Sequence, residues 1–307
     1  MGVLKSLPLS RRFVYIVNPV SGTRNKGLLR QKIETFATSA GFPFHIFPSV
    51  ADGDYTFLKI HIAETGVTDV VIAGGDGTIN GVLAGLQQVD VQFGLLPCGS
   101  GNGLAFSTGL SKNIDQALQI ILAGKSAPTD AFLINNQYAC MLCGLGFDAQ
   151  VAHAFAADPA RGLNTYIKKS VQHFFSAKAY PFTLHIQNRM LQTEAFLISI
   201  ANSNQFGNNV TIAPKASLTD GLLDVVIVTK QNKLALIWET LKQVGGYNPV
   251  QDVKAIDKKA GVLYLQTAGL KIENPAGAPM HLDGDPIQTT STINVQLLKE
   301  NFRLIYP

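Results

Sequence analysis

The stretch from Val70 to Asn80 constrains the fold of this 307-residue chain more than any other. It opens with four apolar residues, Val70–Ala73, a run typical of a buried parallel strand. Three glycines follow within four positions, with Asp76 among them. Apolar residues then recur at the spacing of one helical face, at Ile79, Val82, Leu83 and Leu86. The stretch therefore predicts a strand, a glycine turn and a helix in succession.

A turn of this kind has the geometry of a phosphate-binding site. Glycine lets backbone N–H groups approach an anion closely, and the N-terminus of the following helix carries partial positive charge. Asp76 would repel a phosphate unless a cation or a hydroxyl donor lay between them, and a metal-bound nucleotide is the simplest arrangement that meets this condition. The alternative is a tight turn whose glycines serve only the backbone. The polar side chains of Asp76, Thr78 and Asn80, and a second glycine loop at 99–103, favour the functional interpretation.

Strand and helix patterns alternate along the first part of the chain. Short apolar runs predict strands at 13–17, 44–47, 70–73 and 93–96. Helices are predicted after them, at 28–40, 55–64, 78–86, 104–106 and 113–123. This alternation predicts a doubly wound parallel α/β domain over residues 1–128, with ligands bound at the carboxyl ends of its strands. Ser21, Gly22, Arg24 and Lys26 could hold phosphates after the first strand, although a plain connecting turn fits these residues equally well.

The pattern changes after Gly124, where short strands follow one another with few helices between them. A hairpin is predicted around Asn135–Gln137. Strands are expected at 131–134, 138–142, 182–186, 195–201, 222–228, 262–267, 270–272 and 292–297. Such a run predicts an antiparallel β-sandwich domain over residues 129–297. The C-terminal tail, residues 298–307, could return to the first domain.

Two helical stretches interrupt these strands, at 150–178 and 233–244. The first carries an apolar and aromatic stripe, formed by Phe155, Tyr166, Ile167, Val171, Phe174 and Phe175. We interpret this stripe as a candidate lid over an apolar ligand, while a helix packed on the sheet is the simpler alternative.

Composition and charge limit the classes of partner. The net charge of +4 comes from small basic clusters, which fits anionic ligands or a membrane surface. The arginine–aromatic pattern of a nucleic-acid binder is absent from the sequence, so no nucleic-acid partner is expected. No apolar run approaches the ~18 residues that span a bilayer, and the N-terminus lacks a secretory apolar core. We therefore expect a cytoplasmic protein with peripheral membrane association, and a homodimer is compatible with the sequence.

Seven segments form a set that is more specific than any one of them. They are Asn-Pro-Val-Ser-Gly at 18–22, Gly-Gly-Asp-Gly-Thr-Ile-Asn at 74–80, Pro-Cys-Gly-Ser-Gly-Asn at 97–102, Gly-Leu-Gly-Phe-Asp-Ala at 144–149, Ile-Ala-Pro at 212–214, Asp-Gly-Leu-Leu-Asp at 220–224 and Leu-Asp-Gly-Asp at 282–285. In this order they resemble the diacylglycerol kinase-like lipid kinases, a family that includes sphingosine kinases and bacterial diacylglycerol kinases. The resemblance covers nearly the whole chain.

The resemblance implies an ATP-dependent kinase that phosphorylates a hydroxyl of a diacylglycerol- or sphingoid-type lipid, with ATP in the cleft between the two domains. The residues that it implies in ATP binding are Asn18, Pro19, Ser21, Gly22, Ser49, Gly74, Gly75, Asp76, Gly77, Thr78, Asn80, Ser100 and Asn102. It also implies a structural Mg²⁺ in the region of Ser217, Asp220 and Leu222. A tight turn with Asp220 bonded to its own backbone is the alternative there.

In the same family an acidic segment near the C-terminus supplies the catalytic base, and this segment matches Asp283-Gly284-Asp285. The two carboxylates point to the same side if the segment is extended, so one could accept the proton of the lipid hydroxyl while the other orients it or meets the metal. The family's usual position matches Asp285, and Asp283 is the second candidate. Asp76 is the third catalytic candidate, as the group that positions the metal-bound phosphates.

Three positions depart from the family's pattern. Thr23 stands where bacterial relatives usually have lysine, Gly103 stands where they often have aspartate, and Asp285 is one methylene shorter than the usual glutamate. These departures leave the lipid open. They also keep two other functions in view: an NAD kinase-like enzyme, whose fold shares a Gly-Gly-Asp-Gly loop, and a catalytically weak lipid-binding regulatory protein. The three carboxylates at 76, 283 and 285 argue against a simple binding module.

Overall fold

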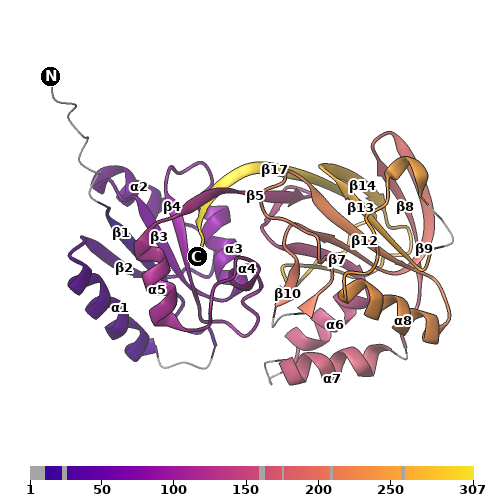
Figure 1. The fold of residues 1–307 in the computed structure, drawn as a ribbon, viewed down its shortest axis with the longest axis horizontal. Helices are drawn as coiled ribbons and strands as arrows, with labels where there is room; N and C mark the ends of the chain where they lie inside the picture. The colour runs from indigo at the N-terminus through magenta and orange to yellow at the C-terminus, as the bar shows by residue number, and fades with distance from the viewer. Residues whose placement is uncertain (1–10, 23–25, 159–162, 175, 208–209, 257–259) are drawn as a thin grey trace.

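The computed structural model describes residues 11–22, 26–158, 163–174, 176–207, 210–256 and 260–307. They form two lobes, an N-terminal α/β lobe and a C-terminal β-rich lobe (Figure 1). Two long strands, β5 (Ser126–Ile134) and β17 (Thr292–Ile305), run between the lobes as a ribbon.

The N-terminal lobe is built on a parallel sheet, as the alternating pattern predicted. Its strands are β1 (Phe13–Val17), β2 (Phe44–Pro48), β3 (Asp69–Gly74) and β4 (Gln92–Pro97), in the order β2-β1-β3-β4. The helices that follow them are α1 (Lys26–Ala40), α2 (Thr56–Thr65), α3 (Asp76–Gly85), α4 (Gly103–Ser107) and α5 (Ile114–Ala123). Every residue of β1 and β3 is buried, which explains why these strands read as continuous apolar runs.

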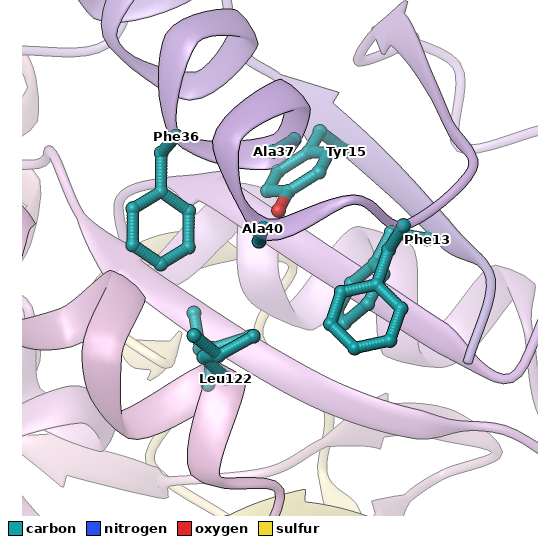
Figure 2. A pocket seen from close by; sticks show the side chains of 8 residues that line it. Phe13, Tyr15, Phe36, Ala37, Ala40 and Leu122 are labelled. Atoms are coloured by element: carbon teal, nitrogen blue, oxygen red, sulfur yellow. The ribbon is translucent and has the colours of Figure 1, made fainter. Parts of the chain in front are cut away.

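Between α1, β1 and α5 the helices of this lobe pack closely on the sheet. The side chains that meet between α1, β1 and α5 are shown in Figure 2; they are Phe13, Tyr15, Phe36, Ala37, Ala40, Phe42, Ile121 and Leu122. The apolar space among them is about 10 Å³, roughly the room one water molecule needs. This space is therefore a packing gap of the core.

The amino ends of the strands are held by a buried carboxylate that the sequence did not reveal. Asp69, at the start of β3, is fully buried and forms an ion pair with Arg11. Thr68 Oγ1 and Gln92 Nε2 also donate to its oxygens, at 2.6 and 2.8 Å. The Arg11 guanidinium donates in addition to the carbonyls of residues 121 and 122 in α5. The pair thus ties α5 to the edge of the sheet opposite the glycine turns.

The ribbon makes one continuous sheet of both lobes. β5 turns into β6 (Gln137–Ala139) through Asn135 and Asn136, whose φ angles of 45° and 68° are those of a tight hairpin turn, as predicted. β17 pairs antiparallel with β5 from Val295 to Ile305, and Arg303 and Leu304 then pair parallel with β4. Residues of the C-terminal tail therefore lie beside the last strand of the N-terminal sheet.

The C-terminal lobe is antiparallel, and the predicted sandwich is confirmed. Its strands are β7 (Leu142–Gly146), β8 (Tyr180–Ile186), β9 (Arg189–Ala201), β10 (Gln205–Gly207), β11 (Val210–Thr211), β12 (Leu223–Thr229), β13 (Val262–Thr267), β14 (Gly269–Glu273), β15 (Met280–Leu282) and β16 (Asp285–Ile287). In β8 the buried residues are every second one, the alternation expected of a strand with one face on a core.

Some element boundaries differ from the prediction. The strand expected at 138–142 is broken at residues 140–141 into β6 and β7, and β17 extends eight residues beyond the predicted end at 297. The helical stretch at 150–178 forms two helices, α6 (Phe147–Ala156) and α7 (Leu163–Phe174). α6 begins earlier because Gly146, with a φ of 85°, turns the chain directly out of β7.

Phe155 and Phe174, the two residues of the predicted aromatic stripe whose side chains the structure describes, are half-buried. Phe174 meets Phe147 edge-on, with ring centroids 6.4 Å apart, while Phe175 lies outside the described residues. The remaining helices are α8 (Lys233–Val244), at its predicted bounds, and the short helix η1 (Val253–Ala255). None of the helices in the described ranges is long and apolar enough to cross a membrane.

The buried ion pair gives a test of this fold. Replacing Asp69 by Ala leaves the Arg11 guanidinium without its carboxylate, and we expect the free energy of unfolding to fall by about 3–5 kcal/mol. Chemical denaturation monitored by circular dichroism measures the change. The matched control is Asp115→Ala, which removes the exposed pair with Lys32 and should cost less than about 1 kcal/mol. Equal losses for the two variants would contradict this role of Asp69.

Candidate active site between the lobes

The glycine turns that follow β1, β3 and β4 pack against one another backbone to backbone. A Cβ built on Gly99 would lie 2.4 Å from the Cα of Gly75, and one built on Gly22 would lie 2.1 Å from the carbonyl oxygen of Cys98. Real Cβ atoms do not come this close to other heavy atoms, so only glycine fits at either position. The predicted convergence of the three turns is therefore present, and the glycines serve contacts between loops.

Side chains join the first turn to the central one. Asn18 donates from Nδ2 to Thr78 Oγ1 at 2.6 Å, and its Oδ1 accepts the N–H of Val20 at 2.8 Å. Ser49 lies after β2, where its N–H bonds the carbonyl of Val17 at 3.1 Å. Pro19 is exposed and Ser21 is half-buried at the same edge, while Thr23 and Arg24 lie outside the described residues.

The second glycine loop is closed by Asn102. Its Oδ1 accepts the N–H of Gly99 and its Nδ2 donates to the carbonyl of Gly99, both at 2.8 Å. Asn102 is buried and has a left-handed φ of 54°. Its amide group is thus used inside the loop, whereas Ser100 is exposed. The shape of the loop depends on Asn102, and its predicted contact with ATP stays a prediction.

Asp76 connects the central turn to the second loop. It is half-buried at the start of α3, and its Oδ1 accepts the N–H of Leu104 at 3.3 Å, in the first turn of α4. Burial raises the pKa of Asp76, while hydrogen bonds from the amides of Asn102, Gly103 and Leu104 act in the opposite direction. The carboxylate therefore faces the amides of the loop that lies across from its own helix.

Asp283 lies in a tight turn between β15 and β16, so the segment is not extended, and extension was the condition under which the two carboxylates would point to the same side. Asp283 and Gly284 have φ angles of 49° and 91°, so the side chains of Asp283 and Asp285 do not share a face. The Asp283 carboxylate is buried and accepts the N–H groups of Leu142, Met141 and Cys140 at 2.8, 3.1 and 3.3 Å. This carboxylate fixes the break between β6 and β7.

The electrostatic setting of Asp283 differs from that of a solvated aspartate. The pKa of its carboxyl group is raised to about 6; burial is the main cause and the nearby Asp76 carboxylate adds to it, against the opposing effect of the three amides. No lysine, arginine or histidine in the described ranges forms an ion pair with either Asp76 or Asp283. A buried carboxylate and a half-buried one thus lie near each other at the interlobe surface.

Asp285 reaches across from the sandwich lobe to the N-terminal lobe. Its side chain is exposed, and its Oδ2 lies 3.0 Å from the place that a Cβ on Gly77 would occupy. Gly77 lies in the first turn of α3 and is itself exposed. On the same side, Asn80 donates from Nδ2 to the carbonyl of Tyr138 at 3.1 Å. The predicted catalytic segment and the predicted phosphate turn therefore face each other between the lobes.

Sequence reasoning missed a buried histidine that supports this turn. His281 Nδ1 accepts the N–H of Gly284 at 3.2 Å, so we assign the proton to Nε2, which lies 3.4 Å from Asp148 Oδ2. Both side chains are buried, and a Cβ on Gly144 would lie 2.2 Å from His281 Nε2. The only signal was Asp148 within the segment at 144–149. The pair Asp148–His281 holds the turn from which Asp285 projects.

The predicted metal region forms a self-bonded turn at the start of β12. Asp220 Oδ1 accepts the N–H of Leu222 at 3.0 Å, and Ser217 Oγ accepts the N–H of Thr219 at 3.4 Å. This matches the turn that was the alternative to a metal site. Burial, and then the neighbouring Asp130 carboxylate, raise the pKa of Asp220. No group of three or more histidine, cysteine or acidic side chains suited to a metal occurs in the described part of the chain.

Two families of protein domain match the chain in succession. Residues 12–134 match the Diacylglycerol kinase catalytic domain, and residues 142–296 match the YegS C-terminal NAD kinase beta sandwich-like domain. The second match alone spans half of the chain, and the two matches divide close to the change in sequence pattern.

Several curated proteins are similar to this chain over most of their length. A probable lipid kinase YegS-like protein of Chromohalobacter salexigens is 28% identical over 240 residues, which cover 76% of this chain and 75% of that protein. One of the same name from Citrobacter koseri is 27% identical over 289 residues, covering 92% and 89%. A crystal structure of a putative diacylglycerol kinase from Bacillus anthracis has the same fold, with a TM-score of 0.79 at 21% identity over 97% of each chain.

The glycine turns, the facing carboxylates and the sandwich thus define a phosphotransferase of the lipid kinase class. Within that class, the chain belongs to the diacylglycerol kinase-like family. Among these two matches, only the sandwich domain resembles NAD kinase, because the N-terminal lobe matches the diacylglycerol kinase catalytic domain.

The raised pKa of Asp283 predicts a pH dependence of stability. The folded state holds this proton more tightly than the unfolded chain, whose aspartate pKa is about 4, so the contribution of Asp283 is present at acid pH and is lost as pH rises to about 6. The loss amounts to about 3 kcal/mol at most. We expect the difference in free energy of unfolding between wild type and Asp283→Asn to change over this range. A difference that is constant from pH 4 to pH 7 would show that the carboxyl group is not shifted.

Proposed function

We propose that the protein transfers the γ-phosphoryl group of ATP to a hydroxyl of a diacylglycerol- or sphingoid-type lipid, in the space between the lobes. The observation that carries this proposal is the approach of the Asp285 carboxylate to the first turn of α3 at Gly77. A proton acceptor and an anion-binding helix terminus then face each other across one site, as phosphoryl transfer to an alcohol requires.

The nucleotide would lie along the glycine turns. Gly77 and Ser100 are exposed there, and the first N–H groups of α3 have no partner within the helix itself, which suits its N-terminus to an anion. Asn18 and Thr78 fix the spacing between the first and central turns, and Asn102 fixes the second loop. ATP, when bound, supplies the phosphoryl group and the leaving group of the reaction.

Asp285 is the residue that we assign as the base. Its carboxylate is exposed, so it can accept the proton from the lipid hydroxyl as the new P–O bond forms and the bond to the ADP leaving group breaks. Asp283 is assigned a positioning role because its carboxylate already accepts three backbone N–H groups. Together with His281, it sets the direction in which Asp285 leaves the turn.

The residues present fit a magnesium requirement at the interlobe site. Burial raises the pKa of Asp76, which forms no ion pair among the described residues, and a hard cation takes carboxylate oxygens. Asp283 is left out of this set because its carboxylate already accepts three backbone N–H groups. Bound Mg²⁺ would neutralise charge on the ATP phosphates. The turn of Ser217, Asp220 and Leu222 stays the second candidate, where one Asp220 oxygen accepts a backbone N–H.

The lipid, the membrane surface and the oligomeric state belong to the same proposal. A peripheral position on the bilayer would let the sandwich lobe receive the lipid. The aromatic stripe of the stretch at 150–178 is proposed as the lid over the apolar part of that lipid. A homodimer and the role of a weakly active regulatory protein are compatible with the fold.

One experiment separates a lipid kinase from an NAD kinase-like enzyme and from a regulatory protein: labelling of a total lipid extract by γ-³²P-ATP, with NAD offered in a parallel reaction. Label in lipid supports the proposal, and label in NAD alone refutes it.

The assignment of the base predicts the behaviour of Asp285→Asn. The amide keeps the shape of the side chain but cannot take the proton, so kcat should fall roughly 10²- to 10⁴-fold while the affinity for ATP stays nearly unchanged. The midpoint of thermal unfolding should not move, since the side chain is exposed. Asp283→Asn is the matched control, and it should shift stability more than kcat. Near-normal turnover by Asp285→Asn would place the base elsewhere.

Asp76 carries a separate prediction. Asp76→Asn removes the negative charge beside the phosphate turn, and we expect kcat to fall on the order of a hundredfold or more with the fold intact. Steady-state kinetics at several Mg²⁺ concentrations measure the fall in kcat, and circular dichroism shows whether the fold is intact. An early-melting variant that keeps full activity while folded would mean that Asp76 serves only to join α3 to α4.

A further inference from the structure

Helix α8 presents its apolar side to solvent. Five large apolar residues, Leu234, Ile237, Trp238, Leu241 and Val244, are exposed at positions i, i+3, i+4, i+7 and i+10. This spacing places them on one side of the helix, which we call the α8 outward face. Leu234, Trp238 and Leu241 are 81%, 63% and 61% exposed, so the face is open along its whole length.

The opposite side of α8 is the one attached to the protein, and it is partly polar. Leu236 and Gln243 are buried there, seven positions apart. Gln243 donates from Nε2 to the carbonyl of Ile212 at 2.8 Å, and its Oε1 accepts from Asn248 at 3.0 Å. A surface helix normally buries its apolar side. The reversed arrangement leaves five large apolar side chains exposed together on one side of the helix, as is common at interaction sites.

The chemistry of the surroundings indicates what covers this face. Residues 230–254 contain four lysines and two acidic residues, and residues 163–178 contain three lysines and no acidic residue. α7 and α8 lie along the same lower edge of the C-terminal lobe in Figure 1. Three of these lysines are neutralised by ion pairs, Lys169 with Asp158, Lys230 with Glu194 and Lys242 with Glu239. Lys168, Lys178 and Lys254 are exposed and form no ion pair among the described residues. Cationic side chains around an apolar patch are complementary to an anionic lipid surface.

Aromatic residues on the face point to the same partner. Trp238 lies in the middle of the α8 outward face, and Tyr247, 79% exposed, follows the end of the helix. Both side chains are amphipathic and are enriched where protein meets the interface of a bilayer.

We propose that the α8 outward face docks on the surface of a phospholipid bilayer, with the apolar side chains in the interface and Lys168, Lys178 and Lys254 over the lipid headgroups. The inference rests on the proposed function in one respect: a lipid kinase must take its substrate from a bilayer. It goes further in naming the surface that the protein applies to the membrane.

The chain carries its own reporter for the test. Trp238 is the only tryptophan in the sequence, so intrinsic tryptophan fluorescence reports on the α8 outward face alone. We expect its emission to shift to the blue when vesicles of phosphatidylglycerol and phosphatidylcholine are added. Vesicles that contain brominated acyl chains should quench it.

The variant that tests the surface is Leu234→Glu/Leu241→Glu, which keeps Trp238. Two charges on the face should weaken vesicle binding at least tenfold, measured by sedimentation and by the fluorescence shift. The control is Ile60→Glu on α2 in the N-terminal lobe, where an isoleucine that is 54% exposed receives one charge away from the α8 outward face. Circular dichroism establishes that each variant is folded. Vesicle binding that survives the double substitution would overturn the proposal.

Two further measurements separate this inference from its alternatives. Analytical ultracentrifugation without lipid shows whether the face instead joins two copies of the chain. The membrane role is refuted if wild type forms a dimer that the double substitution dissociates and does not bind vesicles. Turnover of a dispersed short-chain lipid should be unchanged in the double variant, while turnover of lipid in vesicles should fall. Absence of any lipid turnover by wild type would refute the proposed function, and the fluorescence result would still decide the docking surface.

Discussion

The pairing of β17 with β5 and, at its end, with β4 determines how the two lobes face each other. One ladder of backbone hydrogen bonds runs from the sandwich into the parallel sheet, so the lobes are held by secondary structure as well as by side-chain packing. The approach of Asp285 to Gly77 depends on this pairing. A shift of the ribbon by one residue would reverse the side-chain faces of β17 and move the sandwich relative to the phosphate turn.

The three carboxylates of the interlobe site have different tasks because their surroundings differ. Asp283 accepts three backbone N–H groups and is buried, Asp76 accepts amides of the loop opposite its helix, and Asp285 is exposed. Asp283 and Asp76 hold loops in place through backbone N–H groups, whereas Asp285 is the residue that we propose as the base. The Asp148–His281 pair extends this support one layer further from the site.

Local sequence patterns were sufficient for the fold class, since burial on one or both faces of an element imposes periods of 2 and 3.6 residues. They located α8 at its bounds, the hairpin at Asn135–Asn136 and the glycine turns. The patterns could not show the turn at Asp283, because an Asp-Gly-Asp segment fits an extended strand and a tight turn alike. Nor could they show Arg11–Asp69 or Asp148–His281, whose partners are 58 and 133 residues apart and meet only in the folded chain. The family resemblance identified residues of the site, and the contacts of Asn102 and Asp283 came only from three dimensions.

The return of β17 to β4 also bears on how the protein can be divided. A fragment ending near residue 128 would lack Arg303 and Leu304, which cover the outer edge of β4. An uncovered strand edge readily pairs with another chain, so such a fragment would tend to self-associate. A fragment carrying only residues 129–297 would lose the pairing of Phe302–Ile305 with the start of β5. The two lobes, which the sequence pattern separates clearly, are therefore expected to unfold as one cooperative unit.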